Sequence, residues 1–139
     1  MLSLNRDRVG AQNVDYVLAD ILSWSRDRRY DLVFFAFWLS HVPKARFEAF
    51  WHLVRESVVP GGHFFFIDEL SNKLAQEFET KLGSGIVRRT LDDGRVFRAV
   101  KVYYRPIQLE RKVSDLGWNA RVESCGRYFY SGCGEARPS

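Results

Sequence analysis

The sequence predicts an α/β fold built on a parallel sheet, and three observations support this prediction. Residues 30–37 (YDLVFFAF, apolar from Leu32 onward) and 63–67 (HFFFI) form continuous apolar runs, as is typical of strands buried on both faces. Between them, residues 43–58 have the spacing of an amphipathic helix, with apolar side chains at Phe47, Phe50, Trp51, Val54 and Val58. A strand, a helix and a strand in this order form a right-handed parallel crossover.

A helix end and a short strand are expected before this crossover, and turn residues are expected to end its helix and its second strand. Residues 2–9 have the pattern of the end of a helix, and Gly10 is placed as its left-handed stop. Residues 14–18 (VDYVL) predict a short strand that ends at Ala19 and Asp20. We expect residues 60–62 (PGG) to end the central helix, and Asp68 and Glu69 to follow the strand at 63–67.

The carboxyl-terminal half is expected to contain helices and antiparallel strands. Apolar spacing favours a helix from Ser71 to Leu82, with Gly83 as its stop. The dipeptide Asp93-Gly94, between strand-like runs at 86–91 and 96–103, predicts an inserted β-hairpin. Residues 106–116 predict a last helix that ends at Gly117, and residues 121–123 and 127–130 predict an antiparallel pair.

Composition narrows the functional classes. The 139 residues, 46% apolar and 27% charged, suggest one globular domain. No segment is long enough to span a bilayer and no apolar signal core follows Met1, so we expect a cytoplasmic chain without a membrane partner. The net charge of +4 is small and the basic residues are mixed with acids, so no nucleic-acid partner is expected. Cys125 and Cys133 lack the spacing and the nearby histidine of a zinc site, so no metal is expected.

Three segments together resemble the class I S-adenosylmethionine-dependent methyltransferases: 14–22 (VDYVLADIL), 30–43 (YDLVFFAFWLSHVP) and 58–69 (VVPGGHFFFIDE). The likeness continues through the end of the last helix at 110–118 (ERKVSDLGW). PGG before an apolar strand is common by itself, but the order and spacing of the segments are characteristic of the family. The resemblance implies an α/β, doubly wound (Rossmann-like) sheet that binds its ligand beyond the carboxyl ends of the strands. It also implies S-adenosyl-L-methionine as the cofactor and a small-molecule methyl acceptor.

The resemblance also suggests the binding residues. Asp20 corresponds to the acid that pairs with the adenine amino group, and Ile21 to the apolar residue that covers the ring. The alternative is that Asp20 caps the following turn. Ala36 and Phe37 correspond to the positions that meet the methionine part of the cofactor. The aromatic faces of Phe37 and Trp38 suit a sulfonium, although both also suit a core.

The segment Leu39-Ser40-His41-Val42 matches a frequent family motif. His41 is therefore a candidate for positioning the acceptor or accepting a proton. The alternative is a structural histidine that holds its loop. No other catalytic residue is indicated, because in-line methyl transfer depends mainly on holding donor and acceptor close together.

The glycine-rich turn after the family's first strand and the ribose-binding acid after its second strand have no counterpart in these 139 residues. We therefore expect an incomplete, amino-terminally truncated methyltransferase domain over residues 1–139. The family strand order 3-2-1-4-5-7-6 predicts that the strand at 14–18 lacks its inherited neighbour and that the strands at 31–37 and 63–67 have one unpaired edge. The resulting function is methyl transfer to an unidentified acceptor, with weak or absent cofactor binding by this chain. The alternative is a non-catalytic module that completes its sheet with a partner or forms an oligomer through the exposed edge.

Overall fold

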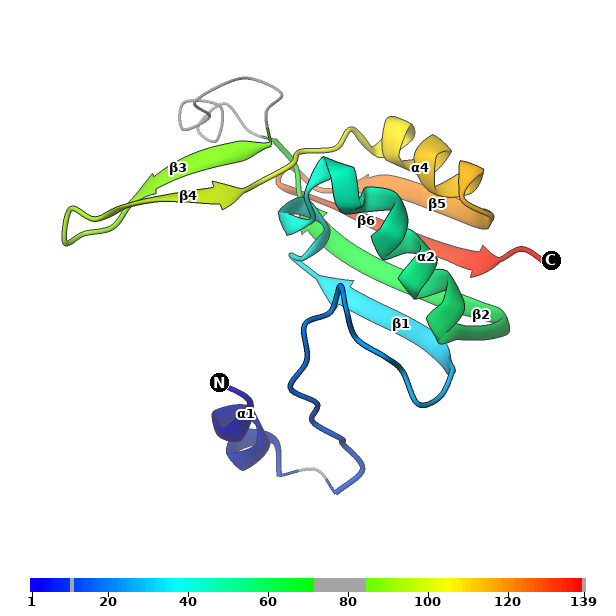
Figure 1. Cartoon of the computed structure of the whole chain (residues 1–139). Helices are drawn as coiled ribbons and strands as arrows, with labels where there is room; N and C mark the ends of the chain where they lie inside the picture. Colours follow the sequence, from blue (N-terminus) through cyan, green and yellow to red (C-terminus); the bar gives the residue numbers. More distant parts are fainter. Residues whose placement is uncertain (11, 72–84, 139) are drawn as a thin grey trace.

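Figure 1 shows the computed structural model, which describes residues 1–10, 12–71 and 85–138. Four strands form the main sheet in the order β1-β2-β6-β5: β1 (Tyr30–Ala36), β2 (Val58–Glu69), β6 (Phe129–Ala136) and β5 (Trp118–Cys125). β1 and β2 are parallel, whereas β6 is antiparallel to both β2 and β5. This order is the 4-5-7-6 part of the family sheet, so the expected incomplete fold is confirmed.

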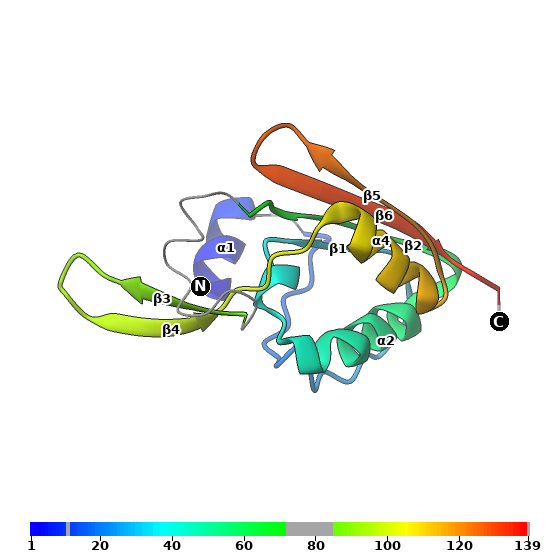
Figure 2. The ribbon, with the colours of Figure 1, turned by 90° about the horizontal axis from the view of Figure 1, so that it is seen from above.

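The two longer helices pack on the same face of this sheet (Figure 2). α2 (Phe47–Ser57) follows a short 3-10 turn at Lys44–Arg46 and leads directly into β2, while α4 (Pro106–Asp115) leads into β5. PGG therefore lies inside β2 rather than in a loop after the helix. The helices bury their apolar sides in one core with the strands.

Trp51 of α2 lies at the centre of this core. Its ring centroid is 4.8 Å from that of Phe64 and 6.2 Å from that of Trp118, and the Phe64 and Trp118 centroids are 4.8 Å apart. The helical spacing and the apolar strands recognised in the sequence thus meet in an aromatic cluster that fixes α2 on the sheet.

Two expectations about the strands are wrong. Residues 14–18 form no strand, because a strand needs a neighbour and the sheet contains none beside them. The apolar strands are not buried on both faces either. Leu32 is 54% exposed and Phe34 59% exposed, because both helices cover the opposite face.

The remaining elements follow the sequence more closely. α1 (Leu2–Val9) ends at Gly10, whose φ of 58° is the left-handed conformation expected of a helix stop. β3 (Ile86–Thr90) and β4 (Val96–Val100) form the predicted hairpin, which extends away from the main sheet (Figure 1). The predicted antiparallel pair is confirmed and lengthened to the full β5–β6 ladder. The helix predicted from Ser71 to Leu82 lies almost entirely outside the described residues.

Candidate functional site

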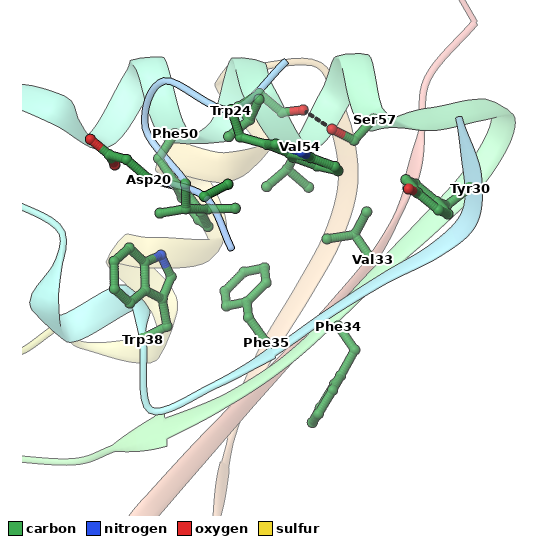
Figure 3. A pocket seen from close by; sticks show the side chains of 13 residues that line it. Asp20, Trp24, Tyr30, Val33, Phe34, Phe35, Trp38, Phe50, Val54 and Ser57 are labelled. Atoms are coloured by element: carbon green, nitrogen blue, oxygen red, sulfur yellow. Dashed lines mark hydrogen bonds between the residues drawn. The ribbon is translucent and has the colours of Figure 1, made fainter. Parts of the chain in front are cut away.

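A cleft of about 630 Å³ lies between α2, β1 and the loop that precedes β1 (Figure 3). Most of its walls are apolar or aromatic, and Asp20 adds a carboxylate. The lining residues are Ala19, Asp20, Ile21, Trp24, Tyr30, Val33, Phe34, Phe35, Trp38, Phe50, Leu53, Val54 and Ser57. Such a lining suits a flat, mostly apolar ligand that carries a few polar groups.

A short turn presents the first lining residues to the cleft. Asp20 Oδ1 accepts a hydrogen bond from the Leu22 backbone N–H at 3.0 Å, and the Asp20 carbonyl accepts one from the Ser23 N–H at 3.1 Å. Asp20 therefore caps its turn, as the structural alternative anticipated. The side chain is nevertheless exposed at the cleft, so the turn also places a carboxylate there.

Aromatic rings form much of the cleft wall. Trp24 stacks on Tyr30 with ring centroids 6.4 Å apart, and Phe35 meets Phe50 edge-to-face at 5.2 Å. Figure 3 shows Trp38 and Asp20 near the same end of the cleft. A planar heteroaromatic ring has stacking surfaces here, and a carboxylate is in place for an exocyclic amine.

The end of β1 carries a second notable feature. Phe37 has a φ of 53°, which is uncommon for a residue with a side chain and costs about 1 kcal/mol or more. Its N–H donates to the Ile67 carbonyl at 2.9 Å, and its ring meets Phe129 at a centroid distance of 5.9 Å. Backbone strain of this kind concentrates at functional sites.

The loop after β1 is held by buried polar contacts. The carboxylate of Asp68, which is fully buried, accepts hydrogen bonds at 2.8 Å from the backbone N–H groups of Ser40 and Glu69. His41 Nδ1 lies 2.8 Å from the Val100 carbonyl oxygen. This contact occupies one ring nitrogen of His41 and supports its role in holding the loop.

Only some of the candidate site residues from the sequence line the cleft. Asp20, Ile21 and Trp38 line the cleft, whereas Ala36, Phe37 and His41 do not appear in its lining. Sequence reasoning missed Trp24. It placed Phe50 in the core, which is confirmed, and Phe50 also lines the cleft. Trp24 lies in a segment without periodicity, so only its aromatic character marked it.

Residues 1–10, 12–71 and 85–138 contain no group of three or more His, Cys, Asp or Glu side chains that is suitable for holding a metal ion. Within the same residues, no helix has the length and apolar character needed to cross a membrane.

Comparison with known proteins supplies independent information. No protein-family model matches the chain, and no match was found among curated proteins. The chain is similar to a solved DhpI–SAH complex, with 39% identity and a TM-score of 0.80 over 99% of this chain and 62% of that one. It is also similar to a complex of DhpI with SAM and HEP, with 41% identity and a TM-score of 0.78 over 98% and 63% of the two chains.

A more distant structure shares the fold. An S-adenosylmethionine-dependent methyltransferase from Clostridium acetobutylicum ATCC 824 is 13% identical, with a TM-score of 0.73 over 98% of this chain and 70% of that one. The chain spans about three fifths of the length of the two DhpI structures.

Proposed function

We propose that this chain, which belongs to the class I S-adenosylmethionine-dependent methyltransferase family, takes part in methyl transfer from S-adenosylmethionine to a small-molecule acceptor. The observation that carries the proposal is 39–41% identity, over nearly the whole chain, to DhpI structures solved with SAH or SAM. One of them was solved as a complex with SAM and HEP, and we propose that the acceptor of this chain is a small molecule. We also propose that residues 1–139 form one incomplete methyltransferase domain.

The described residues fit the nucleoside part of this cofactor. An adenine ring matches the aromatic walls of the cleft, and its amino group matches the exposed carboxylate of Asp20. We assign ring contacts to Ile21 and Trp24, and the methionine part to Ala36 and Phe37 at the end of β1. The exposed aromatic face of Phe37 suits a positively charged sulfonium.

Methyl transfer requires these side chains mainly to position the donor and the acceptor. When bound, S-adenosylmethionine supplies a methyl group that passes to the nucleophilic atom of the acceptor while the bonding electrons stay on sulfur. The protein holds the two reactants in line, and we propose that Phe37 and the loop 38–42 contribute to that alignment. We propose His41 only as a residue that positions this loop, because its Nδ1 already faces Val100.

Isothermal titration with S-adenosylhomocysteine tests the proposal. We expect weak but saturable binding, which Asp20→Ala reduces about tenfold through the loss of a charge-assisted hydrogen bond. Asp20→Asn keeps an oxygen for the Leu22 N–H and separates loss of charge from loss of the turn. The matched control is Asp31→Ala, since Asp31 is exposed on β1 and outside the cleft lining.

The outcomes differ clearly. Equal losses in the Asp20 and Asp31 variants would contradict the assignment of Asp20. Tight, micromolar binding by the unmodified chain would contradict the incomplete-domain proposal, because such affinity needs more of the cofactor site than these residues provide.

A second function is favoured by the open side of the sheet. β1 is an edge strand of the described sheet, and Leu32, Phe34 and Phe65 expose apolar surface next to that edge. These features suit a module that adds a partner's strand. A concentration-dependent oligomer with β1 amides protected from hydrogen exchange supports this function, whereas a monomer at all concentrations argues against it.

We further propose a cytoplasmic location. Cys125 and Cys133 are both free and exposed, as is usual where thiols are kept reduced.

A further inference from the structure

Lys101 and Asp68 are the buried charged residues of the part of the chain that the structure describes. Lys101 is only 2% exposed, although lysine is almost never fully buried unless it is paired. Its Nζ lies 2.9 Å from Glu69 Oε2, 3.0 Å from Ser40 Oγ and 4.0 Å from Asp68 Oδ1. One ammonium group therefore faces three oxygen atoms from two separate segments.

The backbone around Lys101 ties the same segments together. The Lys101 N–H donates to the Gly85 carbonyl at 2.8 Å, and the Val102 N–H donates to the Ser40 carbonyl at 2.7 Å. With the contact between His41 and Val100, residues 100–102 bind both the start of the hairpin and the loop after β1. The root of the hairpin is thus fixed where β1 and β2 end.

Electrostatics explain why an ammonium is needed at this point. Asp68 is fully buried, and burying a carboxylate is costly without a nearby positive charge. Burial and the charge of Asp68 raise the pKa of Tyr104 to about 12, and the same causes raise the pKa of Tyr130. Both phenols stay neutral near pH 7, so they add no negative charge to the cluster.

The two carboxylates at the end of β2 differ in their surroundings. Asp68 points into the core, whereas the Glu69 side chain is 45% exposed and bound by Lys101 through one oxygen. The alternation of side chains along β2 produces this division. Glu69 is thus a carboxylate held in place at the carboxyl end of β2, the end of the parallel strands beyond which this type of fold binds its ligands.

We propose that Lys101 is a positioning residue of the acceptor side. It fixes the hairpin β3–β4 against the loop 38–42 and holds the Glu69 carboxylate at the carboxyl end of β2, the end of the sheet at which the proposed function places the acceptor. A lysine suits this task because its ammonium is compact and has three N–H donors for oxygens in different directions. This assignment of an acceptor side rests on the proposed methyltransferase function.

Amide hydrogen exchange of the whole chain tests the positioning role. Lys101→Met removes the ammonium and keeps most of the side-chain length. We expect the Lys101 and Val102 amides to exchange about tenfold faster or more, while the β2–β6 ladder keeps its protection. Arg98→Met is the matched control on the exposed part of β4 and is expected to leave both root amides unchanged.

Two milder variants keep the test decisive if Lys101→Met does not fold. Ser40→Ala and Glu69→Gln each weaken one contact of Nζ without leaving Asp68 unpaired. Each is expected to speed exchange at the hairpin root by a smaller factor than Lys101→Met. Unchanged root amides in these variants, or uniformly faster exchange throughout the sheet, would overturn the proposal.

Titration with S-adenosylhomocysteine separates this proposal from the proposed function. Lys101 does not line the cleft, so its variants are expected to lower the affinity for S-adenosylhomocysteine less than Asp20→Ala does, through a looser loop 38–42 that carries Trp38. Faster exchange at the root without S-adenosylhomocysteine binding in any variant would leave Lys101 as the residue that holds the hairpin root, and would contradict the binding expected of this chain. A loss of affinity equal to that of Asp20→Ala would refute the separate role of Lys101.

Discussion

Gly132→Ala tests how tightly β6 packs on the core. The glycine lies opposite Phe66 in the β2–β6 ladder, and a Cβ at this position would overlap the Cε1 and Cζ atoms of that ring. The Phe66 ring is fully buried, and it stacks on Phe35 at 5.3 Å and on Phe64 at 5.9 Å. It therefore has little space in which to move, and one added methyl group must strain the core.

Overpacking of this kind typically costs about 1–3 kcal/mol, and we expect a loss of free energy of unfolding in the upper half of that range. Urea unfolding followed by tryptophan fluorescence measures the loss, because Trp51 and Trp118 lie in the same core. Gly134→Ala is expected to behave similarly, since its Cβ would lie 2.6 Å from Phe64 Cε1 and 2.9 Å from the Asn119 carbonyl oxygen.

The matched control is Cys133→Ala, which lies between the two glycines with an exposed side chain. We expect it to change the free energy of unfolding by less than about 0.5 kcal/mol. Combining Gly132→Ala with Phe66→Leu should cost less than the sum of the single changes, because the smaller side chain makes room for the methyl group. A Gly132→Ala protein as stable as the control would refute the packing described for β6.

Three further predictions concern the core, the open face and alkaline pH. Trp51→Ala should cost about 3–5 kcal/mol in urea unfolding, as expected for a fully buried aromatic side chain, and a loss below about 1 kcal/mol would contradict its central place. Phe34→Ser should reduce binding of an apolar dye and self-association with little loss of stability, because Phe34 is exposed; unchanged dye binding would contradict this. The folded pKa of Tyr104, about 12, exceeds its unfolded value of 10.0, so its contribution is complete below about pH 10 and is lost as pH rises toward 12. Urea midpoints measured across this range should fall less in Tyr104→Phe, and equal slopes would contradict the shifted pKa.

The sequence predicted the elements whose signals are local. The spacing from Phe47 to Val58 predicted α2, and Asp93-Gly94 predicted the hairpin, because each depends on neighbouring residues only. The strand expected at 14–18 failed for a different reason. Its apolar pattern was present, but a strand needs a partner strand, and the family strand order already indicated that its neighbour is missing from these residues.

The candidate site was predictable only in part. The resemblance to the family marked Asp20 and Ile21, which line the cleft, whereas Trp24 and Phe50 reach it from segments far apart in the chain. Asp68 and Glu69 are adjacent acids with similar chemistry in the sequence. Only the pleat of β2 and the position of Lys101 distinguish a buried structural carboxylate from one held at the surface.

The register of the β2–β6 ladder makes Cys133 a useful reporter of the open face of the sheet. Cys133 pairs with Phe65 across the β2–β6 ladder, on the face of the sheet that the helices leave open. A thiol reagent should therefore modify it readily in the isolated chain and slowly once another polypeptide covers that surface. The rate at which the Cys133 Sγ is alkylated would therefore show whether another polypeptide has bound to the open face of the sheet.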